Sequence, residues 1–425
     1  EWNAHRTQPD GPRELLGNTI ATSGVLSRLG TYGRKGFSDD SLGKNCGEEV
    51  MCDFFSLRDL WTEPGSAHFD ELVDEFVEIY HFYLKVVGVD GLRVDTVKHV
   101  HHEFWDEFTS RLRARLGSDA MKKLLFGEVY DGRPEMLGRY TWRADWQEDS
   151  RPSLDSVLDF DFCFQARAYL RHPGDHYGSA SGLEKALTNR TASDSSGRPF
   201  YNPNPGPDGL NSQQKMITFI ENHDGLNRFR VKGVTELRNR LAQALVLTLP
   251  GIPCLYYGTE FAIQDKEAET SWDSETGRMM VFAKGSGLIA EEVRKSAPFR
   301  EISQLAKLRS EIRALREGRF IPLWVDNPAS SDDDGVFAFC CATDDGKSIA
   351  VVVVNASSED RVTAAPGHAM QLPNIDGLDG KQIRPALTVG AGKSPEFEIL
   401  NASGPLSLPA PASSLVVYQL LNAAP

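Results

Sequence analysis

The chain has 425 residues, of which 40% are hydrophobic and 25% are charged, which is ordinary for a soluble globular protein. This length predicts two or three domains, and no apolar run approaches the roughly 18 residues that a membrane span needs. The net charge of -14 argues against a nucleic-acid partner, because phosphate binding needs clustered Lys and Arg.

Residues 1–66 are rich in Gly, Asp, Ser and Asn and show little periodicity, so they predict a loop-rich subdomain with short strands. The first residues carry neither the basic region nor the apolar region of a signal peptide. Cys46 and Cys52 are close enough for a local disulfide, and both the disulfide and two free thiols remain open.

A long helix is predicted over 67–87, because its apolar residues recur at steps of three and four. The run 89–95 then predicts a buried strand. Another helix follows, with Phe104, Phe108 and Leu112 on one face.

The alternation of strand and helix continues. Further strands are predicted at 123–129, 156–162, 215–221 and 252–258, and helices at 161–171, 235–249 and 299–317. This order is typical of βαβ units around a parallel sheet. Polar residues gather at the strand ends, which favours a (β/α) barrel over an open sheet for the domain 67–317.

From residue 318 to 425 the sequence becomes β-rich, with strands expected at 336–342, 348–356 and 413–421. We expect an antiparallel β-sandwich there. The acidic run 330–335 is interpreted as a solvated hairpin tip, because it lacks the later Glu of an EF-hand loop.

Three carboxylates stand at the ends of predicted strands. Asp95 ends the strand of GLRVDTVKH, and Arg93 precedes it on the same face, where it can hold the carboxylate ionised. Glu128 in FGEVYDG ends a second apolar strand, and Asp224 with His223 in FIENHD ends a later one. Each has a plain alternative, namely a structural Arg-Asp pair, a surface Glu and a helix N-cap beside a satisfied His.

The combination favours chemistry over these alternatives. Cleavage of a glycosidic bond needs one carboxylic acid to protonate the leaving oxygen and one carboxylate to attack or stabilise the oxocarbenium-like centre. A third carboxylate can hold sugar hydroxyls whose hydrogen bonds strengthen in the transition state. The sequence therefore predicts a glycoside hydrolase, and the retaining mechanism is implied by the resemblance described next.

GLRVDTVKH, GEVYDG and FIENHD resemble three conserved regions of the α-amylase family, in the family's order. GIPCLYYGTE (251–260) resembles its last barrel strand, and SLRDLWT (56–62) resembles the end of its inserted second domain. The resemblance covers residues 56–260 by motif, and the β-rich end is similar to the family's carboxyl-terminal sandwich.

The resemblance implies a role for each residue. Asp95 becomes the nucleophile, Glu128 the general acid/base and Asp224 the residue that fixes substrate hydroxyls. The implied substrate-binding residues are Arg93, which orients the nucleophile, His223 in the reacting-sugar subsite, and Lys98 and His99, a pair that favours endo-acting enzymes. The implied metal ligands of a structural Ca²⁺ are Asp59 and the carbonyl of His99; the alternative is that Asp59 caps a turn.

One family region has no counterpart in this sequence: an Asp followed shortly by an Asn-His pair at the end of the third strand. The five predicted barrel strands therefore correspond to strands 4–8 of a (β/α)8 TIM barrel, incomplete in this chain. Such a fragment would expose strand edges, so we expect the 425 residues alone to be poorly stable and weakly active or inactive.

The predicted reaction is hydrolysis of α-1,4 bonds in starch-like α-glucans or maltooligosaccharides through a covalent glycosyl-enzyme. The alternatives are a transglycosylase on the same fold and a non-catalytic binding module. The expected partner is the α-glucan, with no nucleic acid and no membrane. The family's habit implies secretion, and the oligomeric state stays open.

Overall fold

The computed structural model describes residues 24–33, 59–146, 152–170, 178–224, 228–265, 277–278, 291–326, 335–373, 381–391 and 404–422, with short pieces at 14–15, 18–19, 37–38, 53–54, 378, 393–395 and 400–401. The chain divides into two compact units. The first comprises residues 1–158 and 199–213, and the second comprises 159–198 and 214–425. The domain boundaries expected near residues 66 and 317 stay predictions.

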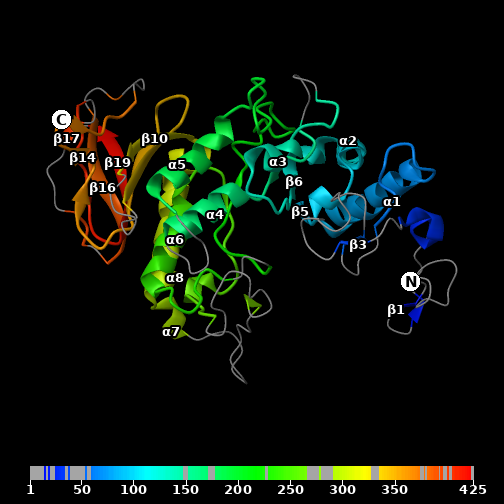
Figure 1. Ribbon diagram of the computed structural model, residues 1–425, viewed down its shortest axis with the longest axis horizontal. Coiled ribbons are helices and arrows are strands. Elements are labelled where there is room, and N and C mark those ends of the chain that lie inside the picture. Colours follow the sequence, from blue (N-terminus) through cyan, green and yellow to red (C-terminus); the bar gives the residue numbers. More distant parts are fainter. Residues whose placement is uncertain are drawn as a thin grey trace. The chain divides into compact units, whose positions relative to one another are not determined.

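The first unit contains a three-stranded parallel sheet flanked by helices (Figure 1). Strand β5 pairs with β6 from Gly91 opposite Leu124 to Val94 opposite Gly127, and β6 pairs with β7. The elements are β1 (Glu14–Leu15), β2 (Asn18–Thr19), β3 (Phe37–Ser38), β4 (Asp53–Phe54), α1 (Phe69–His81), β5 (Gly91–Val94), α2 (His102–Leu116), β6 (Leu124–Gly127), α3 (Pro134–Arg139) and β7 (Ser156–Val157).

Helix α1 was predicted as one α-helix to residue 87, and the structure differs at its end. The α-helix stops at His81, and Phe82–Val87 continue as a π-helix that Gly88 closes with φ 85°. A left-handed residue after a helix favours glycine, which lacks the Cβ that would clash there. The wider π-turn rotates Tyr83 to 47% exposure and Val87 to 56%, so the apolar face predicted from the periodicity does not stay buried to its end.

The second unit begins with helices and ends in strands. Its elements are α4 (Phe160–Tyr169), α5 (Ala180–Thr188), β8 (Ile217–Thr218), α6 (Glu236–Thr248), β9 (Ile252–Pro253), α7 (Glu291–Arg294), α8 (Ala297–Glu311), α9 (Ala314–Glu317), β10 (Arg319–Val325), β11 (Val336–Ala342), β12 (Ile349–Asn355), β13 (Arg361–Val362), β14 (Ala364–Ala365), β15 (His368–Ala369), β16 (Lys381–Gly390), β17 (Leu400–Asn401), β18 (Pro409–Ala410) and β19 (Ser414–Asn422). Strands β8 and β9 pair in parallel. All five strands predicted for the barrel are thus present, each shorter than its apolar run.

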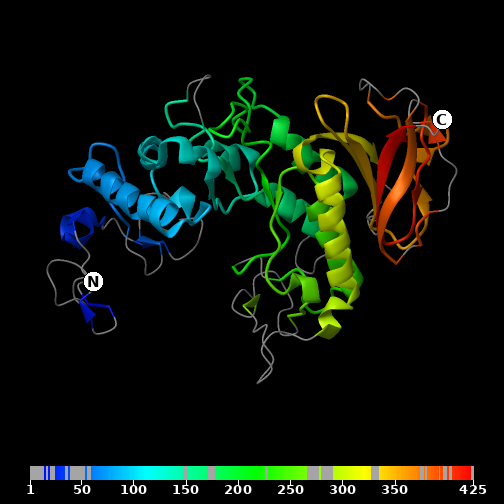
Figure 2. The same cartoon turned by 180° about the vertical axis from the view of Figure 1, so that it is seen from behind.

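A six-stranded antiparallel sheet, in the order β10-β11-β12-β19-β16-β17, forms the carboxyl-terminal part (Figure 2). Its residues alternate between two cores. Phe337 and Phe339 pack with buried residues of α5, α6 and α8, whereas Ala338 and Cys340 pack on the other side with Met370 and its neighbours. Burial on both faces explains why β11 is apolar throughout and β12 is apolar up to its last residue, Asn355. In the described residues only the short pairs β13-β18 and β14-β15 accompany this sheet, so the sandwich stays a proposal.

Two expectations lie outside the described residues: the Cys46–Cys52 disulfide and most of the acidic run at 330–335. In the part of the chain that the structure describes, no helix has the length and apolar character needed to cross a membrane.

Candidate active site

The parallel register brings Asp95 and Glu128 to the same edge of the sheet. Val94 lies opposite Gly127, so each carboxylate is the next residue after a paired strand end. The amide of Glu128 donates to the carbonyl of Val94 at 2.7 Å, which extends the pairing by one residue. The carboxyl ends of neighbouring parallel strands therefore place the two acids side by side, as the sequence predicted.

One guanidinium group contacts both acids. Arg93 Nη1 donates to Asp95 Oδ1 at 2.7 Å, and Arg93 Nη2 lies 3.4 Å from Glu128 Oε1. Arginine presents its donors in a rigid planar fork, so it can fix two carboxylates at a defined spacing. The structure thus shows the predicted Arg93–Asp95 contact and adds Glu128 as a second partner of the same side chain.

The two carboxylates differ in environment. The Asp95 side chain is 63% exposed, whereas that of Glu128 is 8% exposed. Burial, followed by the hydrogen bond and the charge of the Asp95 carboxyl, raises the pKa of Glu128 from 4.5 to about 7 against the opposing charge of Arg93. A buried acid that keeps its proton near neutral pH beside an exposed carboxylate is the arrangement that acid catalysis requires.

The turn after Asp95 is strained and tightly packed. Thr96 has φ 49°, an uncommon conformation for a β-branched residue, and its amide lies 3.5 Å from Glu128 Oε2. The amide of Val97 donates to the Glu128 carbonyl at 3.0 Å. A Cβ on Gly127 would lie 2.7 Å from Val97 Cγ2 and 2.8 Å from Leu154 Cδ1, so glycine alone permits this approach.

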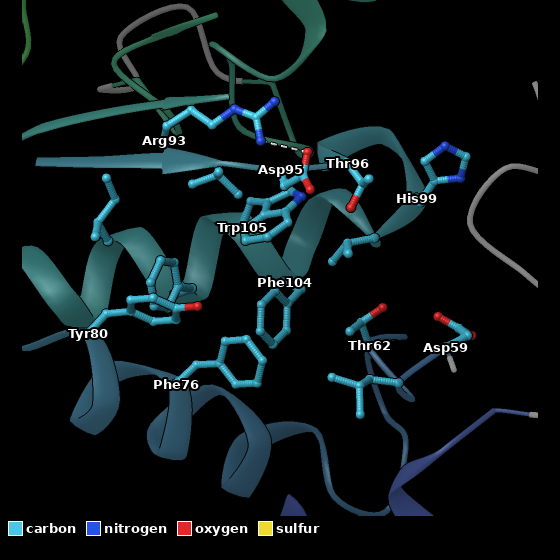
Figure 3. Close-up of a pocket in the computed structure, with 15 residues that line it drawn as sticks. Asp59, Thr62, Phe76, Tyr80, Arg93, Asp95, Thr96, His99, Phe104 and Trp105 are labelled. Carbon is cyan, nitrogen blue, oxygen red and sulfur yellow. Dashed lines mark hydrogen bonds and ion pairs between the residues drawn. The ribbon is translucent and has the colours of Figure 1, made fainter. Parts of the chain in front are cut away.

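A cavity of about 380 Å³ opens beside β5 (Figure 3). Asp59 and His99 lie at one end of it, and Phe76 and Tyr80 lie at the other. Asp95 lines the same cavity, so the nucleophile candidate and the two residues expected to bind calcium, Asp59 and His99, line one space. In the described residues no group of three or more His, Cys, Asp or Glu side chains could hold a metal ion.

Lys98 is buried and does not open onto solvent. Its side chain is 1% exposed, and Nζ donates to the carbonyl of Tyr130 at 2.8 Å. The ammonium therefore helps hold the segment that follows Glu128. Burial raises the pKa of Asp131, but the hydrogen bonds and charge of Arg133 and, to the smallest extent, the charge of Lys98 bring this pKa below its usual value. The predicted contact of Lys98 with a sugar stays a prediction.

His223 and Asp224 lie together in the second unit. His223 Nε2 is 3.2 Å from Asp224 Oδ2, and the Asp224 amide donates to the Asn222 side chain at 3.0 Å. Arg278 Nη2 donates to Asp224 Oδ1 at 3.0 Å. Arg278 was missed by sequence reasoning, because it lies 54 positions along the chain and in no recognised motif. The meeting of Asp224 with Asp95 and Glu128 stays a prediction.

The raised pKa of Glu128 predicts a pH-dependent stability. The folded protein binds this proton more tightly than the unfolded chain does, so burial costs little below pH 4.5 and costs progressively more up to about pH 7. The variant Glu128→Gln removes this cost. At pH 8 we expect the free energy of unfolding of this variant to exceed that of the wild type by roughly 3 kcal/mol at most. At pH 4.5 we expect little difference between the two proteins. Urea unfolding at both pH values measures this, and an equal difference at both would contradict it.

The sequence is similar to those of known proteins. The family model for the α-amylase catalytic domain matches residues 50–304. An α-amylase of Streptomyces lividans is 29% identical over 401 residues, which cover 86% of this chain and 38% of that protein. A cyclomaltodextrin glucanotransferase of Bacillus licheniformis is 31% identical over 269 residues, which cover 63% of this chain and 30% of that protein. The chain thus spans well under half the length of these two relatives.

Solved structures share the fold. The α-amylase from Geobacillus thermoleovorans, complexed with acarbose, matches with a TM-score of 0.66 at 20% identity, over 93% of this chain and 72% of that one. The cyclomaltodextrin glucanotransferase CldA matches with a TM-score of 0.62, also at 20% identity, over 95% of this chain and 69% of that one. Because the family model covers more than half of the residues, this chain belongs to the α-amylase family.

Proposed function

We propose that the protein cleaves α-1,4-glucosidic bonds in starch-like α-glucans or maltooligosaccharides and retains the anomeric configuration. The observation that carries this proposal is the pair of acids on Arg93. Glu128 is buried with a pKa raised to about 7, and Asp95 is exposed and bound to the guanidinium. One guanidinium can contact both carboxylates only if they lie close together, which suits the spacing of about 5–5.5 Å in retaining enzymes.

In the first step a carboxylate oxygen of Asp95 attacks the anomeric carbon. The bond from that carbon to the leaving oxygen breaks, and the Glu128 proton goes to the leaving oxygen. In the second step Glu128 takes a proton from water, and the water oxygen displaces Asp95 from the anomeric carbon. Together the two steps return both acids to their starting states and consume one water molecule for each bond cleaved.

Further roles follow from the family. Asp224 would bind hydroxyls of the reacting sugar, with His223 beside it, and His99 would line the cavity near the nucleophile. Lys98 would act mainly by holding the Tyr130 carbonyl. Its burial favours this positioning role over direct contact with sugar.

Transglycosylation is the second candidate. Several similar proteins carry the name cyclomaltodextrin glucanotransferase, whereas others carry the name α-amylase. In a transferase a sugar hydroxyl replaces water in the second step, and the same two acids serve. A non-catalytic module is the third candidate, and the paired carboxylates argue against it.

Incubation with maltoheptaose separates the three. A hydrolase releases shorter reducing sugars, a transferase also forms longer or cyclic products, and a binding module leaves maltoheptaose intact. The variant Glu128→Gln serves as the control in each assay. Equal product formation by this variant and the wild type would mean that another site performs the reaction.

We propose also that the five parallel strands belong to a (β/α)8 barrel of which this chain holds strands 4–8, followed by a carboxyl-terminal β-sandwich. The open edge of β5, whose neighbour in the described sheet lies on one side only, supports this. Residues 1–425 expressed alone are then expected to be weakly active. Turnover by these 425 residues at the level of a complete amylase would contradict it.

A structural Ca²⁺ is proposed at Asp59 and the carbonyl of His99, because both residues line one cavity and Ca²⁺ prefers oxygen ligands. Six to eight ligands are usual, so others must come from carbonyls, water or residues outside the described set. We expect chelation with EDTA to lower the melting temperature of the wild type, and calcium to restore it. In Asp59→Ala the same titration should give a smaller change. An equal change in melting temperature in both proteins would show that Asp59 does not bind the calcium.

Secretion stays a prediction of the resemblance. Recovery of the protein from the culture medium of its source, against a cytoplasmic marker, would test it.

A further inference from the structure

One buried carboxylate, that of Glu221, joins two described stretches of the chain, residues 221–224, which carry Asp224, and residues 228–229. Glu221, which is 5% exposed, accepts from the amide of Phe229 at 2.8 Å and from the hydroxyl of Thr259. Thr259 begins a short 3-10 helix six residues after strand β9, so Glu221 connects the segments that follow two neighbouring parallel strands, β8 and β9. A buried carboxylate is costly unless its hydrogen-bond donors stay in place. Glu221 therefore holds Phe229 and Thr259 in fixed positions beside residues 221–224.

Arg228, the residue before Phe229, contacts Gly277. Its side chain is fully buried, and its guanidinium carbon lies 4.2 Å and 4.6 Å from the ring centres of Tyr256 and Tyr257. From this position Nε donates to the carbonyl of Gly277 at 3.2 Å. Stacking against two rings leaves the guanidinium little freedom, so the Gly277 carbonyl is held at a fixed place.

Arg278 follows Gly277 and contacts His223 and Asp224 directly. Nε donates to the His223 carbonyl at 2.9 Å, and Nη2 donates to Asp224 Oδ1 at 3.0 Å. The two acceptors belong to successive residues, so the planar fork fixes both the backbone before Asp224 and the rotation of its carboxylate. A lysine ammonium in the same place could not reproduce both directions.

We propose that Arg278 is a positioning residue for Asp224, held in place through Gly277 by the buried Arg228. The proposal rests on the proposed function, because Asp224 is assigned there to the substrate. Arg278 keeps one oxygen of Asp224 occupied and His223 lies beside the other, so the carboxylate meets the sugar in a single orientation. Loss of this orientation affects the transition state more than the ground state, because hydroxyl contacts strengthen as the reaction proceeds.

The experiment compares Arg278→Ala and Arg278→Lys with the wild type, all as the full-length gene product, on maltoheptaose. We expect kcat to fall by about 100-fold in both variants and KM to change by less than about threefold. Guanidinium ion at millimolar concentration should restore part of kcat in Arg278→Ala, and ethylammonium should not. The matched control is Arg313→Ala, which removes an exposed ion pair with Asp345 in the same unit and should leave kcat unchanged.

The outcomes are distinct. A kcat for Arg278→Ala close to that of the wild type overturns the proposal. Full activity in Arg278→Lys overturns the two-bond positioning, because charge alone would then suffice. A variant that loses activity by misfolding would show a lowered melting temperature and no rescue by guanidinium, which also counts against positioning. If the wild type cleaves no α-glucan, the proposed function itself fails and this inference fails with it.

Discussion

Replacing Glu128 with glutamine is expected to lower kcat on maltoheptaose by roughly 10²- to 10⁴-fold, because the leaving oxygen no longer receives a proton. The Glu128 side chain is 8% exposed, and its pKa is raised to about 7, so it carries a proton at lower pH. The glutamine amide is of similar size, but its N–H groups are far too weakly acidic to protonate the leaving oxygen. In the wild type, kcat/KM should fall as pH rises through about 7, the range in which Glu128 loses its proton.

An α-maltosyl fluoride separates this role from a structural one. Fluoride leaves without protonation, so Glu128→Gln should form the glycosyl-enzyme from this substrate at a rate near that of the wild type. The second step should remain slow, because no base activates water, and added azide should accelerate it. A variant that is equally poor at forming the glycosyl-enzyme from both substrates would show that Glu128 supports the fold of the site and is not its acid.

Replacing Asp95 with asparagine is expected to lower kcat further, by roughly 10⁴- to 10⁶-fold, because the nucleophile itself is lost. The loss should be similar for maltoheptaose and for the fluoride, since both need attack on the anomeric carbon. Asp95 is 63% exposed, so the variant should unfold at nearly the wild-type temperature. Steady-state kinetics on both substrates, with a thermal melt, measures this.

Asp119→Asn provides the matched control for Asp95. Asp119 also pairs with a basic residue in the first unit, namely Lys85, but precedes β6, whereas Asp95 and Glu128 follow their strands. Its replacement should leave both substrates unaffected. An Asp95→Asn protein with activity comparable to that control would exclude Asp95 as the nucleophile.

The strand ends were predictable from sequence because the signals there are local. A short apolar run bounded by polar residues predicts a parallel strand. The position directly after its last apolar residue is where the candidate catalytic acid is expected. Asp95 and Glu128 follow β5 and β6 in this way. The contact between Arg93 and Asp95 was also predictable, because residues two apart in a strand share a face.

Other features depend on distant or non-local contacts. The pairing of Arg278 with Asp224 joins residues from separate segments, and no periodicity records it. The burial of Lys98 follows from the position of the Tyr130 carbonyl, which depends on the register of β5 and β6. The π-helix at Phe82–Val87 keeps the apolar residues of an α-helix, so composition alone could not distinguish the two.

The most direct test of the paired-acid account is the configuration of the first product. Proton NMR of maltoheptaose cleavage, recorded before the anomers interconvert, shows which anomer the enzyme releases. Attack by Asp95 followed by attack from water predicts that the α-anomer appears first. Initial appearance of the β-anomer would mean a single inverting displacement and would contradict the roles assigned to Asp95 and Glu128.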